Sequence, residues 1–153
     1  GCTSPRLSNK EMFPTFARTV STNIPVSLAM AQLFYTFSWK EVAIVSASSA
    51  YVFSAAAQTL DKELKRLGID RNIFYFETLE DIVSALALVK KEGTNIVALF
   101  CKDADVRKVM LAAKDLGMTV PGFAFISVET TSSVAYTARV GNHGIQDGRD
   151  EEA

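Results

Sequence analysis

The chain has 153 residues, of which 48% are hydrophobic and 22% are charged. This size and balance are typical of one folded domain with its own core, and not of a disordered, collagen-like or coiled-coil segment. Sixteen basic and seventeen acidic residues give a formal net charge of −1, so no overall positive field favours nucleic acid or an anionic membrane surface as a partner. The longest apolar region, residues 24–39, is interrupted by polar residues and is shorter than the roughly 20 residues that cross a bilayer.

The first forty residues predict a connector followed by a helix. Residues 1–20 contain Pro5 and Pro14, and each proline disfavours helix in the residue before it, so an extended segment is expected. Ser21 or Thr22, followed by Pro25, forms a helix-start signal. The predicted helix, residues 26–37, is apolar around most of its circumference, and we expect it to be well buried.

From residue 40 onward, short β-branched or aromatic runs alternate with runs of helical period. The predicted strands are residues 41–45, 72–76, 95–100 and 122–127. A continuous apolar run such as residues 96–100 is typical of a parallel strand that helices cover on both faces. The pattern therefore predicts an α/β fold: an open parallel sheet of about four strands with helices on both faces.

Three further helices are predicted between these strands. The first, residues 52–67, stops at Gly68. The second is capped by Thr78, with Asp81 three places later, and ends at Gly93. The third is capped by Asp103 or an adjacent residue and runs to Gly117. Residues 130–153 are polar without periodicity, which predicts either a loose tail or a connection into further structure.

The motifs of the common enzyme classes are absent from the sequence. There is no Walker A, GxGxxG, HExxH or GxSxG motif. The single histidine, His143, lies in the polar tail, where nothing indicates the oriented partner that a general base needs. Cys2 and Cys101 have no zinc-site spacing, and Cys101 is interpreted as a small buried apolar residue in preference to a reactive thiolate. We expect no catalytic residue, no cofactor and no metal in this segment.

The candidate binding residues are identified by their position at the ends of the predicted strands. Open parallel sheets bind ligands at the carboxyl ends of their strands, where helix amino ends present free amides. The richest such stretch here is residues 46–51, with three serines and a tyrosine. The alternative, that these serines only cap the following helix, is at least as well supported. The candidate ligand-binding residues are Ser46, Ser48, Ser49, Tyr51, Glu77, Lys102 and Glu129.

Several short segments in the first 45 residues follow a specific order and spacing. They are Gly1-Cys2-Thr3-Ser4-Pro5, Leu7-Ser8-Asn9-Lys10, Phe13-Pro14-Thr15-Phe16-Ala17-Arg18-Thr19 and Phe37-Ser38-Trp39-Lys40-Glu41-Val42-Ala43-Ile44-Val45. In these segments the chain resembles the extracellular ligand-binding region of receptor guanylate cyclases, part of the natriuretic-peptide-receptor and type I periplasmic-binding-protein-like family. The strand and helix series to Ser127 agrees with the second lobe of that family.

The resemblance implies a two-lobed clamshell on the extracellular side of the plasma membrane, in a single-pass protein. Residues 1–20 would be the inter-lobe connector, residues 21–129 a ligand-binding lobe, and residues 130–153 a polar tail or a cut connection to the missing lobe. The implied partners are a peptide or small-molecule ligand and a second copy in a homodimer, without membrane contact by this segment. Signalling would pass by lobe or dimer rearrangement to a cyclase region that makes cyclic GMP from GTP, and that region's catalytic residues are not in this chain.

The sequence departs from the family after the strand at residues 41–45. Where the family often has an Asp-x-x-Tyr-Gly segment, this chain has Ser48-Ser49-Ala50-Tyr51-Val52, which keeps only the tyrosine. Two alternatives stay open. One is a small α/β enzyme or nucleotide binder that uses residues 46–51 and 101–103. The other is a truncated product with no independent role, which exposed apolar surface on the helix at residues 26–37 would mark.

Overall fold

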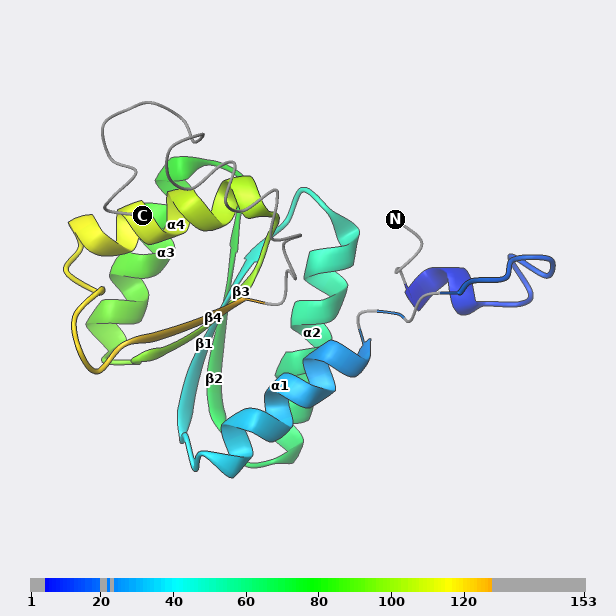
Figure 1. Cartoon of the computed structure of the whole chain (residues 1–153), viewed down its shortest axis with the longest axis horizontal. Helices are drawn as coiled ribbons and strands as arrows, with labels where there is room; N and C mark the ends of the chain where they lie inside the picture. Colours follow the sequence, from blue (N-terminus) through cyan, green and yellow to red (C-terminus); the bar gives the residue numbers. More distant parts are fainter. Residues whose placement is uncertain (1–4, 20–21, 23, 128–153) are drawn as a thin grey trace.

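Four parallel strands form the centre of the computed structural model, which describes residues 5–19, 22 and 24–127 (Figure 1). The strand order is β2-β1-β3-β4. Register pairs Ile44 of β1 with Ile73 of β2 and with Ala98 of β3. The predicted open parallel sheet is confirmed. The strands are β1 (Glu41–Ala47), β2 (Asp70–Phe76), β3 (Ile96–Phe100) and β4 (Ala124–Ser127).

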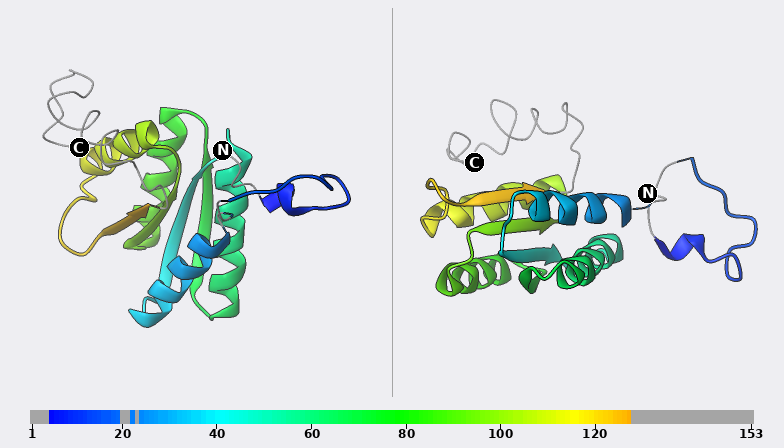
Figure 2. Two further views of the ribbon diagram at one scale, coloured as in Figure 1. Left: turned by 45° about the vertical axis from the view of Figure 1, so that its right-hand side comes forward. Right: turned by 90° about the horizontal axis from the view of Figure 1, so that it is seen from below.

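Helices cover both faces of this sheet. Figure 1 shows α1 (Ile24–Thr36) and α2 (Tyr51–Arg66) on one side, and α3 (Leu79–Glu92) and α4 (Asp103–Asp115) on the other. The connections from β1 to β2 and from β3 to β4 therefore run over opposite faces of the sheet. Residues 5–19 lie to one side of these layers in both views of Figure 2.

The alternation of side chains along the strands divides the core into two clusters. Val42 and Ile44 of β1 pack with α1 and α2, whereas Ala43 and Val45 pack with α3 and α4. Ala98 and Phe100 of β3 join the first cluster, and Val97 and Leu99 join the second. Residues 42–47 and 97–100 are all buried, because helices exclude water from both faces of these strands.

The ends of α3 confirm the sequence signals most closely. The Thr78 hydroxyl accepts a hydrogen bond from the Asp81 amide (3.2 Å), and the Asp81 carboxylate accepts one from the Thr78 amide (2.9 Å). This capping box satisfies amide groups that the first turn cannot pair internally. At the other end, Gly93 adopts the left-handed conformation, with φ of 79°, which costs a residue without a Cβ little.

The N-cap of α4 lies within the predicted pair of positions: it is Lys102, next to Asp103, because the backbone of Lys102 is still extended while Asp103 is already helical, although no side chain caps this helix. The prediction of an extended segment over residues 1–20 is wrong in one part. Residues Pro5–Ser8 form a short 3-10 helix (η1) within the segment predicted to be extended. The Asn9 side chain accepts hydrogen bonds from two following amides and so favours a turn directly after it.

The helix α1 is also less buried than its composition indicates. Its buried side chains lie on one face only and are Ser27, Met30, Ala31 and Phe34. Large apolar residues on and just after the helix remain 39–60% exposed: Val26, Leu28, Leu33, Tyr35 and Phe37. The cause is geometric, since α2 and the sheet contact a single side of this helix in the described part of the chain.

Candidate functional site

The sheet has a topological switch point between its two central strands. From β1 the chain turns to β2 on one side, and from β3 it turns to β4 on the other. The loops that follow β1 and β3 therefore diverge at neighbouring strand ends, which is where open α/β sheets bind their ligands. These loops contain Ser48, Ser49 and Lys102.

One hydrogen-bond set joins two of the predicted site residues, which are 29 positions apart. The Ser48 hydroxyl lies 2.9 Å from Glu77 Oε1 and 3.1 Å from the carbonyl oxygen of Phe76, and it donates its one proton to either acceptor. The Ser48 amide donates to the same carbonyl at 3.0 Å. Ser48 thus ties the loop after β1 to the loop after β2 and fixes the Glu77 carboxylate beside it.

The other candidate residues differ in accessibility. Tyr51 is the first residue of α2 and is 60% exposed; Ser49 and Lys102 are also exposed. Ser46, in contrast, is fully buried in β1, and its hydroxyl lies 3.3 Å from the carbonyl oxygen of Ala47. The structure therefore brings most of these residues to one edge of the sheet but places Ser46 beneath that surface. Glu129 lies outside the described residues.

The helix amino ends at this edge are not equivalent. The Asp81 carboxylate occupies the start of α3, where hydrogen bonds from the Glu77 amide, the Thr78 amide and the Thr78 side chain lower its pKa. No side chain caps α2, whose first turn contains no acidic residue. The start of α2 therefore has no capping side chain, whereas the start of α3 is occupied by the Asp81 carboxylate. The serines predicted as possible caps do not cap α2, because its N-cap position is Ala50.

Two further side chains with reactive groups are Cys101 and His143. Cys101 is fully buried within the cluster beneath α3 and α4, which confirms its interpretation as a small core residue. His143 lies outside the described residues. Within residues 5–19, 22 and 24–127, no group of three His, Cys, Asp or Glu side chains is arranged to hold a metal ion.

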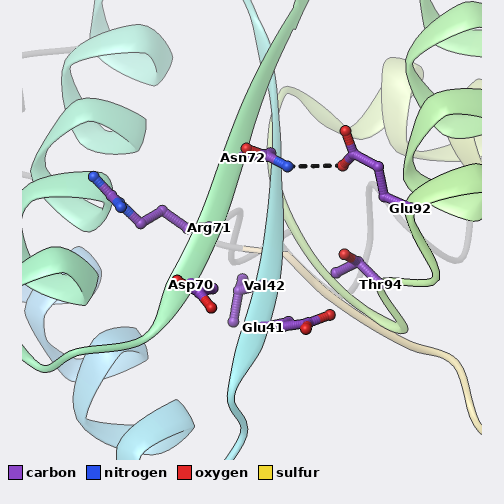
Figure 3. Close-up of a pocket in the computed structure, with 7 residues that line it drawn as sticks. All are labelled: Glu41, Val42, Asp70, Arg71, Asn72, Glu92 and Thr94. Atoms are coloured by element: carbon purple, nitrogen blue, oxygen red, sulfur yellow. Dashed lines mark hydrogen bonds between the residues drawn. The ribbon is translucent and has the colours of Figure 1, made fainter.

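A hollow of about 200 Å³ at the opposite, amino-terminal edge of the sheet was not anticipated from the sequence. Its polar lining comes from β1, β2 and the end of α3, which are far apart in the chain, so no local motif could have indicated it (Figure 3). Arg71 points toward α2 and pairs with Asp61 at 3.1 Å, while Asn72 donates to Glu92 at 2.8 Å. Glu41 and Asp70 also line the hollow.

None of the helices in the described ranges is long and apolar enough to cross a membrane. This finding agrees with the interrupted apolar pattern of residues 24–39.

Comparison with known proteins gives relatives among membrane receptors. The chain is 29% identical over 109 residues to the mouse gamma-aminobutyric acid type B receptor subunit 1, which covers 71% of this chain and 11% of the relative. It is 27% identical over 130 residues to a Drosophila melanogaster metabotropic glutamate receptor (78% of this chain, 13% of the relative). It is 28% identical over 107 residues to the probable metabotropic glutamate receptor mgl-1 of Caenorhabditis elegans (64% and 11%).

The chain thus spans roughly a tenth of the length of these relatives. A family model, described as the receptor family ligand binding region, matches residues 1–146, which is nearly the whole chain. The parallel sheet with helices on both faces agrees with a lobe of that type I periplasmic-binding-protein-like fold. The chain belongs to the receptor family ligand-binding region (ANF_receptor) family.

Proposed function

We propose that this segment is part of the extracellular sensor of a membrane receptor and that it binds a small molecule or peptide at the β1/β3 switch point. The observation that carries the proposal is the convergence of exposed polar side chains at this edge, within a chain of a ligand-binding family. Ser49, Tyr51, Glu77 and Lys102 are accessible there, and Ser48 holds the Glu77 carboxylate at 2.9 Å.

The ligand would be recognised at its two ends. The uncapped start of α2 favours an anionic group, whereas the Glu77 carboxylate favours a cationic or hydrogen-bond-donating group. Tyr51 is the first residue of α2, at the first of these two positions, and offers a ring face and a hydroxyl. Binding would shift the population of lobe or dimer arrangements, so the signal needs no chemistry in this segment.

The longer receptor that would contain this segment, here called the parent protein, would also have a signalling activity of its own. The order of segments from residues 1–45 supports a receptor guanylate cyclase, a single-pass protein that acts as a homodimer and makes cyclic GMP from GTP. This segment would then be inactive as a cyclase by itself. Cyclic GMP formation from GTP by the purified chain would contradict the proposal, and ligand-dependent cyclic GMP formation by cells that express the parent protein would support it.

The relatives favour a second type of receptor as the parent protein. Their names describe receptors for gamma-aminobutyric acid and for glutamate. Both compounds carry a carboxylate and an ammonium group, which match the two ends of the proposed site. In this case the output would be that of those receptors, and no cyclic GMP response would follow ligand binding.

The binding experiment uses the complete ectodomain that contains this segment, with gamma-aminobutyrate and L-glutamate as probes. A probe at about 100 times its Kd stabilises the native state by about 2.7 kcal/mol, which thermal unfolding detects. We expect Tyr51→Ala to weaken binding by about tenfold or more, since it removes a ring and a hydroxyl of the site.

The matched control is Tyr35→Ala. Tyr35 is 54% exposed near the end of α1 and lines the same surface as Lys40 and Ile69, which directly precede β1 and β2, so it tests the same truncation at the other edge of the sheet. Loss of binding in Tyr51→Ala alone supports the site. Equal affinity in both variants and the wild type, or no stabilisation by either probe and no response to peptide ligands, would contradict the proposal.

A further inference from the structure

Two carboxylates lie side by side at the amino-terminal edge of the sheet. Register pairs Glu41, the first residue of β1, with Asp70, the first residue of β2. Residues paired in this way on neighbouring parallel strands point to the same face, and their backbones are about 4.8 Å apart. Both residues are exposed and line the hollow of about 200 Å³. Since like charges at this separation repel each other, a cation near the pair would lower the electrostatic energy.

A third carboxylate lines the same hollow from the end of α3. Glu92 is the last residue of α3, and its carboxylate accepts a hydrogen bond from the Asn72 side chain at 2.8 Å. Asn72 lies two residues beyond Asp70 on β2, which displaces Glu92 from the acidic pair by roughly 6–7 Å of strand. The three carboxylates are thus spread along the hollow. This spread agrees with the finding that no group of three such side chains in the described residues could hold one metal ion.

Two basic side chains close to these carboxylates in the sequence have partners elsewhere. Arg71 is the one basic residue among those that line the hollow in the described part of the chain, and it points toward α2, where it pairs with Asp61 at 3.1 Å (Figure 3). Lys90, two residues before Glu92, donates to the carbonyl oxygen of Leu116. The lining of the hollow therefore retains more negative than positive charge.

A buried hydroxyl group independently points to a ligand in this hollow. Thr94 is 7% exposed and lines the hollow, and Figure 3 shows its side chain pointing from the loop after α3 toward β1. Its amide donates to the carbonyl of Val89 at 3.3 Å, but its hydroxyl has no hydrogen-bond partner among the described residues. A buried polar group without a partner is costly. A hydrogen-bond donor bound in the hollow would satisfy this hydroxyl, whose oxygen can accept as well as donate.

We infer that the hollow is a second binding site, which takes a small organic molecule with two ammonium groups. One ammonium group would lie between Glu41 and Asp70, and the other would donate to Glu92 and to the Thr94 hydroxyl. An ammonium group has three donors and forms strong, charge-assisted hydrogen bonds with carboxylates. A chain of four methylene groups sets two ammonium groups apart by about the same distance as these two acidic positions. The site lies at the edge of the sheet opposite the β1/β3 switch point, so the inference does not rest on the proposed function.

The size of the hollow favours a small molecule over a larger ligand. Its volume of about 200 Å³ is below the roughly 300–1,000 Å³ of pockets for drug-sized molecules. Because the contacts are few and the three carboxylates are exposed, we expect a Kd on the order of 1 mM for a diamine. Binding should weaken as salt is added, since exposed charges are screened.

The test is amide hydrogen exchange on the complete ectodomain with 1,4-diaminobutane, at a concentration well above this Kd and at constant ionic strength. We expect slower exchange in residues 70–72 and 92–94, which border the hollow. Butylamine has the same carbon chain with one ammonium group and should bind about fivefold more weakly, because one of the two ion pairs is lost. Calcium chloride should give no protection of these residues.

Two variants and a matched control locate the site. Glu92→Gln removes one of the three charges and should weaken diaminobutane binding by about threefold. Glu80→Gln makes the same change in the first turn of α3, at the other end of the helix, and should bind like the wild type. Thr94→Val should weaken binding without lowering the free energy of unfolding, because the hydroxyl that it removes has no partner among the described residues.

Unchanged exchange in residues 70–72 and 92–94, equal binding of butylamine, protection by calcium, or equal affinities in Glu80→Gln and Glu92→Gln would overturn the inference. A Thr94→Val variant that loses stability and binds like the wild type would overturn it as well. Protection by a lysine-containing peptide but not by the diamine would assign the hollow to a protein partner and would contradict a small-molecule site. Exchange near Tyr51 with gamma-aminobutyrate or L-glutamate reports on the switch point separately, so failure of one site is distinguished from failure of the other.

Discussion

The helices α3 and α1 each bury four residues on one side, but they differ in their charged residues and in how their ends are fixed. In α3, acidic residues occupy the first turn and lysines the last, and a capping box and a left-handed glycine fix its ends. In α1, no residue is charged. The comparison teaches that segregation of polar and apolar residues, and not apolar content, indicates which side of a helix is buried.

The largest loss of stability is expected when one core side chain is removed from each helix. Phe34 of α1 and Leu86 of α3 are both fully buried. Phe34→Ala should lower the free energy of unfolding by about 3–5 kcal/mol and Leu86→Ala by about 2–5 kcal/mol, since both leave cavities. Urea unfolding measures these losses. A loss below about 1 kcal/mol for Phe34→Ala would show that α1 is not an integral part of the core.

A smaller effect is expected from the cap of α3. Thr78→Ala removes the side-chain acceptor for the Asp81 amide and should lower the free energy of unfolding by about 1 kcal/mol. Thr36→Ala is the control on α1, because the Thr36 hydroxyl only donates to the carbonyl of Gln32; its effect should stay within about 0.5 kcal/mol. Equal effects in the two variants would show that the cap contributes nothing specific to α3.

The smallest effect depends on pH. Hydrogen bonds from the Glu77 and Thr78 amides lower the pKa of Asp81 in the folded state from its ordinary value of 3.8. The stabilisation is therefore complete above the unfolded pKa and is lost as the pH falls through the folded pKa. Asp81→Asn should flatten the dependence of unfolding free energy on pH in this acid range.

The control for this pH effect is Glu80→Gln, which removes the neighbouring charge in the same turn and leaves the capping hydrogen bonds in place. Unfolding by urea at a series of acid pH values compares the variants. If Asp81→Asn shows the same slope as the wild type, the account of the capping carboxylate is wrong.

Much of the fold could be predicted because its signals are local. The apolar run at residues 96–100 identified a doubly covered strand, and Thr78 with Gly93 identified both ends of α3. The start of α4 could not be assigned in the same way, since an aspartate before an apolar run fits both the cap and the first turn. There the backbone of Lys102 is extended and the helix begins at Asp103.

The candidate site was predictable in position but not in detail. Strand ends in a parallel sheet share one edge, which is why Ser48, Glu77 and Lys102 could be grouped from the sequence. The hydrogen bond from Ser48 to Glu77 depends on β1 and β2 being neighbours, which periodicity does not determine. The burial of Ser46 likewise follows from the length of β1, which continues to Ala47.

The most direct test of the central claim is amide hydrogen exchange on the complete ectodomain, with and without the probe that stabilises it. The account predicts slower exchange after ligand addition in residues 48–54 and 77–79 and around Lys102, at the carboxyl ends of the strands. Residues 70–72 and 92–94, which border the hollow at the other edge, should be unchanged. Protection confined to that other edge, with no change near Tyr51, would contradict ligand binding at the switch point.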